Sequence, residues 1–422
     1  MKKSLVLRHS SIAGGGRAPE VLAEDSEPAR AGSGKESPGA INRRAFLHAA
    51  VVPCFAACGG LLAGVPPALG AFAIPPASAT ADDERQFIRE AKFYEKQPYK
   101  KTKCKLCPRE CVIDDQERGY CGARENRGGT YYTLVYSRVA TAHIDPIEKK
   151  PFFHFLPGAE AFSIATAGCN VNCKMCQNWD ISQVRPEQVR ATYAPPERIA
   201  ALAKQNNCPV IAYTYSEPVI FLEYVLDCAQ AGRAAGVRSA VVSGGYIQAE
   251  PLKKLCAQVD AIKIDLKAYS EKFYKEVVNG EMKPVLEAIV AIQKARVWNE
   301  IVYLVIPTLN DSDAEFQGLA RWVKSEVGPD VPLHFSRFHP EYLLKNLPPT
   351  PIETLERGKA IADAEGLHYV YIGNVPGHPA ESTYCPHCKK KVVDRTGYSI
   401  NGMYVHHGKC QFCHTAIPGV WS

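Results

Sequence analysis

Three cysteines occur close together in the segment 168–180, with the spacing C-x3-C-x2-C: Cys169, Cys173 and Cys176. A structural zinc site uses four ligands and a disulfide uses two, so three thiolates on one short loop leave a coordination position of a metal centre open. Thiolates are the usual ligands of iron–sulfur clusters. The spacing therefore favours a [4Fe–4S] cluster with one iron free of protein ligands. The alternatives are a zinc site whose fourth ligand lies elsewhere, or thiols that bind no metal.

Two further groups contain four cysteines each, and their close spacing favours metal ligation over disulfide bonding. The C-terminal group consists of Cys385, Cys388, Cys410 and Cys413. Two C-x2-C pairs fit a structural zinc ribbon, with a rubredoxin-like iron site or an oxidised pair as alternatives. The N-terminal group consists of Cys104, Cys107, Cys111 and Cys121. It fits zinc first, an auxiliary [4Fe–4S] cluster second and disulfides third.

The composition is that of a globular protein rather than a disordered one. The chain has 422 residues, of which 46% are apolar and 22% are charged. This length allows one large α/β domain with small accessory modules. The net charge of +6 is spread over the whole chain and indicates no nucleic-acid partner.

The first 81 residues differ in character from the rest. Arg43 and Arg44 lie within the sequence NRRAFLH, a weakly apolar run follows, and small residues surround Ala79. This pattern predicts a twin-arginine export signal. The alternative is a basic N-terminal segment that contains Arg-Arg by chance.

The elements that must position the cysteine loop are short β-branched runs alternating with helical patterns. The expected strands are 162–166, 210–214, 238–242, 260–265, 301–306, 333–338 and 369–373. This alternation predicts βαβ units, a parallel sheet and a partial barrel, with the chemistry at the carboxyl ends of the strands. The three-cysteine loop directly follows the first of these strands. Upstream, residues 84–96 predict a short amphipathic helix.

Polar residues follow three other expected strands. Glu217 lies in YTYSEP, and the alternative to a binding role is the start of an ordinary helix with Pro218 in its first turn. Ser243 and Gly244 lie in VVSGGYI, which a simple strand-to-helix turn explains almost as well.

Asp265 and Lys267 lie in the sequence IDLKAY. Side chains alternate along a strand with a period of two, so the two charges lie on the same side. Such a pair is costly at the mouth of an apolar strand unless it serves a ligand.

The cysteine loop after a first strand resembles the signature of radical S-adenosylmethionine (SAM) enzymes. The resemblance implies a partial (β/α)6 barrel and a [4Fe–4S] cluster on the three cysteines. It also implies that the amino and carboxylate groups of SAM chelate the open iron, and that reduction cleaves SAM to a 5′-deoxyadenosyl radical. Met175 departs from the pattern, because that position is commonly aromatic in the family.

Within that family the sequence resembles the glycyl-radical-enzyme activases at several positions. Together with the strand-end pattern, the resemblance implies contacts with SAM at Asn178, Ser216, Glu217, Ser243 and Gly244. It implies catalytic contributions from Asp265, Lys267 and His339. A lone histidine is more often structural, so for His339 a structural role is the alternative.

Segments 104–129, 145–158, 168–182, 213–218 and 371–375 together resemble the radical enzyme of the AmmeMemoRadiSam system, which is related to pyruvate formate-lyase activase. The resemblance covers residues ~100 to 422. It implies hydrogen abstraction from a glycine of a partner protein. Radical modification of a small molecule, or of an RNA or protein residue, is the alternative. A non-catalytic electron carrier or scaffold is the alternative from another class.

These patterns predict four regions, a set of partners and two conflicting locations. The regions are a leader (1–81), an N-terminal four-cysteine module (82–150), the partial barrel (151–376) and a zinc-ribbon-like module (377–422). The implied partners are a low-potential electron donor of the flavodoxin or ferredoxin type, and AMMECR1-like and Memo-like proteins; no nucleic-acid or membrane partner is indicated. The signal indicates export, whereas SAM chemistry indicates the cytoplasm.

Overall fold

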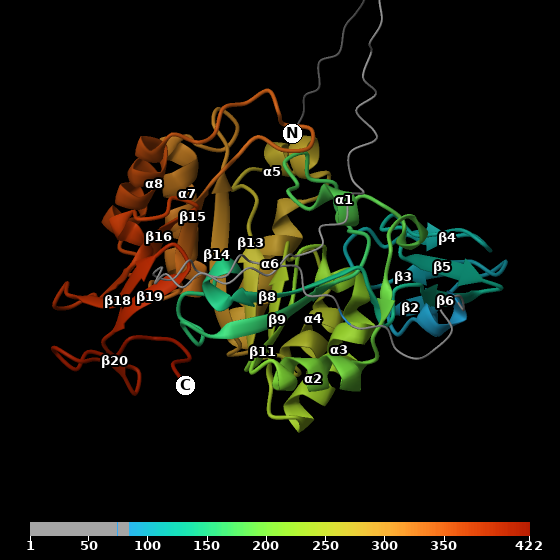
Figure 1. Ribbon diagram of the computed structural model, residues 1–422. Helices are drawn as coiled ribbons and strands as arrows, with labels where there is room; N and C mark the ends of the chain where they lie inside the picture. The colour runs from blue at the N-terminus through green and yellow to red at the C-terminus, as the bar shows by residue number, and fades with distance from the viewer. Residues whose placement is uncertain (1–73, 75–83) are drawn as a thin grey trace, which may run out of the picture. The chain divides into compact units, whose positions relative to one another are not determined.

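The computed structural model describes Ile74 and residues 84–422, so the predicted twin-arginine signal lies outside the described residues. A central sheet has the strand order β16-β15-β14-β13-β12-β11-β9-β8 (Figure 1). Its parallel strands are β9 (Glu160–Ala165), β11 (Val210–Tyr213), β12 (Arg238–Ser243), β13 (Ala261–Asp265), β14 (Trp298–Val305), β15 (Leu333–Arg337) and β16 (Val370–Gly373). All seven predicted strands are confirmed. The edge strand β8 (Thr141–Pro146) runs antiparallel to β9 and was not predicted.

Helices connect the parallel strands and pack against the sheet. The longer ones are α2 (Pro196–Gln205), α3 (Leu222–Ala234), α4 (Ala249–Cys256), α6 (Met282–Lys294), α7 (Asp313–Trp322) and α8 (Ile352–Ala364). Short helical turns are α1 (Trp179–Ser182), α5 (Glu271–Phe273), 3-10 turns at Glu84–Phe87, Ile147–Lys149, Pro186–Gln188, Pro218–Phe221 and Pro379–Glu381, and π-turns at Tyr274–Val278 and Val323–Val327. In α6 the buried residues Val285, Ala288, Ile289 and Ile292 form one helical stripe. The architecture is the predicted α/β partial barrel.

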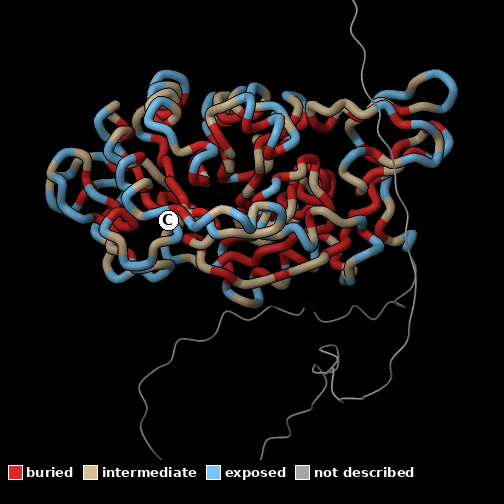
Figure 2. Tube along the Cα trace, turned by 90° about the horizontal axis from the view of Figure 1, so that it is seen from above, coloured by how far each residue is buried: buried red, intermediate tan, exposed pale blue. Residues whose placement is uncertain are grey.

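Figure 2 shows that the buried stretches concentrate in the middle of the molecule, whereas exposed stretches lie in peripheral loops. The central strands are buried almost throughout, as in β11, where all four residues are buried. Parallel strands that are covered by helices tend to have continuous apolar sequences. The sequence therefore predicted these strands well. In the part of the chain that the structure describes, no helix has the length and apolar character needed to cross a membrane.

Small antiparallel sheets precede the barrel. They contain β1 (Arg89–Glu90), β5 (Arg124–Arg127) and β6 (Thr130–Thr133); β2 (Tyr94–Lys96), β3 (Thr102–Cys104) and β4 (Val112–Ile113); and the pair β7 (Arg138–Val139) and β10 (Thr192–Tyr193). The amphipathic helix predicted for residues 84–96 is therefore wrong. Only one 3-10 turn forms there, because β1 pairs with β6 and β2 pairs with β3, so that tertiary pairing overrides a weak helical period.

The C-terminal region adds further short strands: β17 (Thr383–Tyr384), β18 (Lys391–Thr396), β19 (Ser399–Met403), β20 (Val405–His406) and β21 (Lys409–Cys410). It contacts the edge strand β16 and the segment between β8 and β9. Tyr371 of β16 hydrogen bonds Thr383 (Oη to Oγ1, 2.9 Å), and Arg395 donates from Nη2 to the carbonyl of Phe153, in the segment after β8 (2.6 Å). The C-terminal region therefore connects β16 to the segment that follows β8.

Candidate active site

A cavity of about 760 Å³ lies at the carboxyl ends of the central strands, and Cys169, Cys173 and Cys176 line it. Other lining residues come from the central strands β11 to β16 and the turns that follow them, from β8 and the segment after it, and from the C-terminal region. In barrels of this kind the chemistry takes place at that face. The predicted cysteine loop therefore opens into a cavity at the barrel mouth, together with polar residues from several strands.

The backbone of the cysteine loop is held in place from two sides. Gly168 has a φ of +104°, and a Cβ at this position would lie 2.8 Å from the carbonyl oxygen of Cys121, so only glycine fits. The amide of Asn172 donates to the carbonyl of Val278 (3.1 Å), and that of Lys174 donates to the carbonyl of Val277 (2.9 Å). The π-turn that contains these carbonyls thus fixes the middle of the loop.

Burial and charge act in opposite directions on the loop thiols. Burial raises the pKa of Cys173 to about 12, and the nearby ammonium of Lys267 opposes this rise. Burial also raises the pKa of Cys169 well above its usual value, and Glu217 adds to that rise. Thiols in such surroundings become thiolates when a metal centre supplies positive charge. The loop is therefore a better metal-ligand set than a set of free nucleophiles.

Glu217 joins the predicted SAM contacts into one cluster. Its Oε1 accepts hydrogen bonds from Ser243 Oγ (2.6 Å) and the amide of Val219 (3.1 Å), and its Oε2 accepts one from the amide of Gly244 (2.8 Å). Burial raises the pKa of this carboxyl group, and these donors oppose the rise. Glu217 also caps the 3-10 turn that starts at Pro218. The binding and capping interpretations of this residue are therefore compatible.

Asp265 and Lys267 also meet in the cavity, as the alternation along β13 predicted. Lys267 Nζ lies 3.2 Å from Asp265 Oδ2, and Lys263 makes a second ion pair with the same carboxylate. Although burial acts to raise it, the pKa of Asp265 is held at about 2 by Lys263 and Lys267. Sequence reasoning missed Lys263, although it precedes Asp265 by two residues and so lies on the same face of the strand.

Asn178 connects the loop to a further polar cluster. Its Nδ2 donates to the carbonyl of Tyr215 (3.0 Å), whose φ of +68° is unusual for a non-glycine residue. The hydroxyl of Tyr215 donates to Asp145, which also pairs with Lys149 (2.8 Å) and with Lys150. The segment 145–158, to which the sequence assigned no role, thus supplies a wall of the cavity. The sequence gives no sign of this contact, because Asp145 and Tyr215 lie 70 residues apart along the chain.

The structure does not bring His339 to the other predicted residues. His339 is exposed and lies beyond the end of β15, outside the set of residues that line the cavity. His334 lines the cavity instead, because it is an inward-facing residue of the strand itself, and its Nε2 lies 2.7 Å from Glu300 Oε2.

The C-terminal cysteines form a closed set. The Sγ atoms of Cys385 and Cys413 lie 3.5 Å apart, those of Cys388 and Cys410 lie 3.7 Å apart, and all four lie within 4.8 Å of one another. Thiolates around a single tetrahedral zinc, with Zn–S bonds of about 2.3 Å, are separated by about 3.8 Å. This group can therefore bind one metal ion.

The other cysteine groups are more open. Within residues 84–422, neither Cys169, Cys173 and Cys176 nor any three of Cys104, Cys107, Cys111 and Cys121 meet the same 4.8 Å limit. The N-terminal thiols nevertheless influence one another, since negative charge on Cys104 acts, after burial, to raise the pKa of Cys107 to about 12. The two groups also lie close together along the loop at Gly168, as described above.

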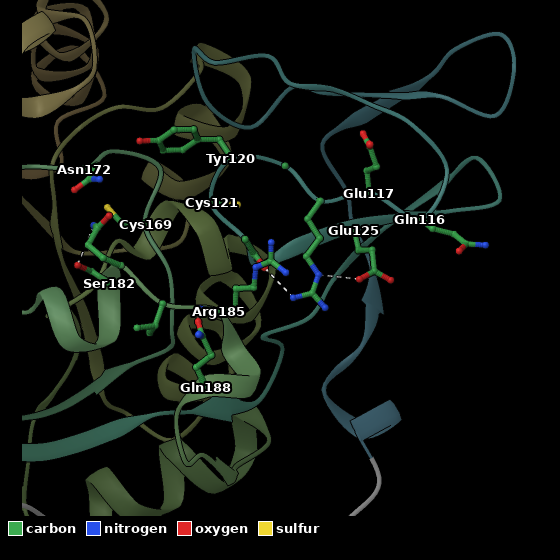
Figure 3. A pocket seen from close by; sticks show the side chains of 15 residues that line it. Gln116, Glu117, Tyr120, Cys121, Glu125, Cys169, Asn172, Ser182, Arg185 and Gln188 are labelled. Atoms are coloured by element: carbon green, nitrogen blue, oxygen red, sulfur yellow. Dashed lines mark hydrogen bonds and ion pairs between the residues drawn. The ribbon is translucent and has the colours of Figure 1, made fainter. Parts of the chain in front are cut away.

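A second cavity, of about 920 Å³, lies between the N-terminal module and the cysteine loop. In Figure 3 Cys169, Asn172 and Ser182 lie on one side of it, and Glu117 and Glu125 lie on the other. Cys169, Ser182 and Gln183 line both this cavity and the cavity at the barrel mouth, so Cys169 lies where the two cavities adjoin.

The module that borders the second cavity is fixed to the cysteine loop. Arg109 donates from Nε to the carbonyl of Asn170 (2.5 Å), and its guanidinium stacks 3.5 Å from the centre of the Tyr120 ring. Cys121 of the N-terminal group lines the same cavity.

Residues 163–322 match the model of the Radical SAM superfamily. An uncharacterized protein of Methanocaldococcus jannaschii, MJ0808, is 44% identical over 332 residues, which are 78% of this chain and 99% of the relative. A domain of a pyruvate-formate lyase-activating enzyme from Bacteroides vulgatus is 17% identical, with a TM-score of 0.35, over 39% of this chain and 98% of its own. SuiB of Streptococcus suis bound to S-adenosylmethionine is 12% identical, with a TM-score of 0.41, over 54% of this chain and 53% of its own. On the match to the superfamily model and the similarity to MJ0808 over nearly its whole length, this chain belongs to the radical SAM superfamily.

Proposed function

We propose that this chain is an enzyme that holds a [4Fe–4S] cluster on Cys169, Cys173 and Cys176 and binds SAM beside it. The observation that carries the proposal is that these thiols open into the same cavity as Glu217 and the Asp265–Lys267 pair. When bound, the cluster and SAM supply a one-electron cleavage of SAM to 5′-deoxyadenosine with hydrogen abstraction from a substrate. Members of this superfamily are enzymes, which argues against a pure electron carrier.

The residues of the cavity fit SAM as a ligand. The hydroxyl of Ser216 is buried at the cavity wall and has no hydrogen-bond partner among the described residues, so it is available to a polar ligand. A Cβ at Gly244 would lie 3.3 Å from Glu217 Oε2, so glycine keeps the approach to that carboxylate open. Glu217 offers a buried carboxylate to the ammonium of the ligand, and Lys267 offers an ammonium to its carboxylate. Met175 is buried at the same wall, where it can pack against the purine.

More specifically, we propose that the chain is the radical enzyme of the AmmeMemoRadiSam system. Its reaction would then be hydrogen abstraction from a glycine of a partner protein. The sequence segments between residues 104 and 375 support it by resemblance. On this proposal AMMECR1-like and Memo-like proteins are the partners. His339 has no part in this proposal, because it is exposed outside the cavity.

A small-molecule substrate is the second candidate, and the closure of the barrel favours it. The C-terminal region contacts β16 and the segment after β8, and its Gly397 and Tyr398 line the cavity together with residues of the barrel. A volume of about 760 Å³ suits a small molecule next to SAM. A glycine of a folded partner must instead enter this enclosed space on an extended loop.

We also propose roles for the flanking cysteine groups. The closed C-terminal set fits a structural zinc. The N-terminal set fits an auxiliary cluster as well as zinc, because its thiols lie farther apart than those of the C-terminal set. A low-potential electron donor can approach from the second cavity, where Cys169 and Cys121 are both at the wall.

The test is anaerobic reconstitution of the full chain with iron and sulfide, followed by reduction and addition of SAM. We expect the electron-spin-resonance spectrum of the reduced cluster to change when SAM is added, and 5′-deoxyadenosine to form. Cys173→Ala is expected to lose both signals. A reduced cluster whose spectrum ignores SAM, in a protein that forms no 5′-deoxyadenosine, contradicts the proposal.

A further inference from the structure

Two polar clusters at the cavity wall contain more lysines than carboxylates. Asp145 is shared by Lys149 (Nζ to Oδ1, 2.8 Å) and Lys150, and Asp265 is shared by Lys263 and Lys267 (Nζ to Oδ2, 3.2 Å). All four lysines line the cavity. Two carboxylates thus face four ammonium groups, which leaves an excess of two positive charges.

Two of these positive charges, those of Lys150 and Lys263, lie largely out of contact with water. The side chains of Lys150 and Lys263 are 2% and 4% exposed, respectively. Burial lowers the pKa of Lys150 to about 8, and the charges of Lys149 and Lys263 contribute to that decrease against the effect of Asp145. The positive charges of Lys150 and Lys263, which line the same cavity, therefore repel each other, and a bound anion would relieve that repulsion.

The other carboxylates of the cavity wall already have partners of their own. Glu217 accepts three hydrogen bonds at the proposed SAM site. Glu148 accepts from the amide of Gly158 and lies 4.0 Å from Arg395, and Glu381 accepts from the amides of His378 and Gly397. The remaining one, Asp180, is exposed at the start of α1. None of these groups forms an ion pair with Lys150 or Lys263.

Glu300, behind the wall, is also fully used. It accepts hydrogen bonds from the amides of Phe153 and His154 and from Trp298 Nε1, and it contacts His334. Its negative charge nevertheless acts on Lys263, its register partner across β13 and β14, so the excess of two positive charges refers to the two lysine clusters alone.

We propose that Lys150 and Lys263 form an anion-binding subsite for the substrate, and that the substrate is a small molecule with a carboxylate or phosphate group. Lys263 lies two residues before Asp265 on β13, about 6.6 Å deeper along the strand, at the rise of about 3.3 Å per residue. An anionic group held there leaves the rest of a small substrate directed towards the cysteine loop. The charge of the subsite thus specifies an acid rather than an amine.

This inference rests on the proposed function and extends it to the substrate. Lys267, nearer to the loop along the chain, is assigned to the carboxylate of SAM, whereas Lys150 and Lys263 stay free of that task. The two assignments separate in experiment. Loss of Lys263 should weaken the binding of the substrate anion and leave SAM binding intact.

The experiment titrates inorganic phosphate and malonate, each against sodium chloride of equal ionic strength, into the reconstituted full chain with and without SAM. The thermal unfolding midpoint reports anion binding, and equilibrium dialysis reports SAM binding. We expect a saturable rise of the midpoint for at least one anion. The apparent dissociation constant should increase at least tenfold in Lys263→Met and in Lys150→Met. Lys263→Arg, which keeps the charge, and Lys283→Met, which changes an exposed lysine on α6, should behave like the unchanged chain.

The two anions distinguish a phosphate from a carboxylate subsite. The inference is overturned if neither anion raises the midpoint more than chloride does, or if the rise is the same in Lys263→Met, Lys150→Met and Lys283→Met. It is also overturned if Lys263→Met loses SAM binding together with anion binding, because the lysine then serves SAM. If Lys263→Met does not fold, Lys150→Met carries the same test. A chain that binds the anion but forms no 5′-deoxyadenosine contradicts the proposed function alone.

Discussion

The C-terminal cysteine group and the cysteine loop of the barrel share the C-x2-C spacing but differ in their surroundings. The four C-terminal thiols lie within 4.8 Å of one another in a small module of short strands. The loop thiols lie farther apart, and Glu217, Asp265 and Lys267 share their cavity. A set of thiols that completes its own coordination shell stabilises a fold, whereas an incomplete set among polar side chains leaves room for a reacting ligand. Spacing along the chain does not separate these two cases.

The largest expected effect is that two matched variants each lose a different metal centre. Cys176→Ser should lose the iron of the barrel cluster and all formation of 5′-deoxyadenosine, because it removes one of only three protein ligands. Cys413→Ser should lose the C-terminal metal and keep the spectrum of the barrel cluster. Metal analysis with spin-resonance spectra measures both. If Cys413→Ser removes the SAM-dependent spectrum, the two sites are not independent and the comparison fails.

Removal of the C-terminal metal by a chelator should unfold the module that contains β17–β21. Structural zinc contributes an apparent binding free energy of about 10–16 kcal/mol at neutral pH, and this small module has few other core contacts. Hydrogen exchange should show loss of protection in residues 383–413. Amides of β11–β13 should keep their protection. Equal loss of protection in both regions would show that the module is an integral part of the barrel.

Asp265→Asn should destabilise the barrel by about 3–5 kcal/mol, since it leaves Lys263 and Lys267 without their shared carboxylate. The matched control is Asp363→Asn, which breaks an exposed pair with Lys359 and should cost less than about 1 kcal/mol. Urea unfolding followed by tryptophan fluorescence measures both. A similar decrease in unfolding free energy for the two variants would contradict the interpretation that Asp265, Lys263 and Lys267 form a tightly coupled charge cluster.

Glu148 tests the contact between the wall of the barrel cavity and the C-terminal module, because it faces Arg395 of that module. Burial raises the pKa of Glu148 to about 7, against the effect of Arg395. The folded chain then keeps a proton between pH ~4.5 and ~7 that the unfolded chain has released, so this group makes stability fall by about 3 kcal/mol as the pH rises through that range.

The variant Glu148→Gln should lack that decrease. The difference in unfolding free energy between Glu148→Gln and the unchanged chain should therefore grow with pH, by about 3 kcal/mol from pH ~4.5 to ~7.5. Urea titrations at four pH values provide the measurement. A constant difference would mean that Glu148 is ionised in the folded chain throughout this range.

The smallest expected effect concerns SAM affinity. Glu217→Gln keeps the shape of the side chain and removes its charge, so binding of the SAM ammonium should weaken about tenfold to a hundredfold, as for loss of a hydrogen bond to a charged group. Equilibrium dialysis measures this change. The iron content should stay the same, unlike in Cys176→Ser. Unchanged SAM affinity would leave Glu217 with its capping role alone.

Much of the fold was predictable because its central strands are buried and largely apolar. The runs at 210–214 and 238–242 differ from β11 and β12 by a single residue at one end. The strand β8 escaped prediction because Thr141–Pro146 mixes polar residues with a terminal proline and lies at the sheet edge. The helix predicted for residues 84–96 was wrong because these residues pair with β6 and β3, and the sequence gives no sign of that pairing.

The site was predictable where one strand end brought the residues together. Asp265 and Lys267 follow from alternation, and Glu217 and Ser243 follow from neighbouring strand ends. Lys150 was missed because its partners Asp145 and Tyr215 come from separate elements. His339 was placed by resemblance, and the structure shows it exposed and outside the set of residues that line the cavity.

The position of Cys169 between two cavities has a consequence for the order of events in a catalytic cycle. A reductant that reaches the cluster from the side of Tyr120 and Cys121 does not occupy the space of a substrate at the barrel mouth. Electron delivery can then follow substrate binding without release of either component. Initial rates should show intersecting rather than competitive patterns for donor and substrate, and wasteful turnover should fall once the substrate is in place.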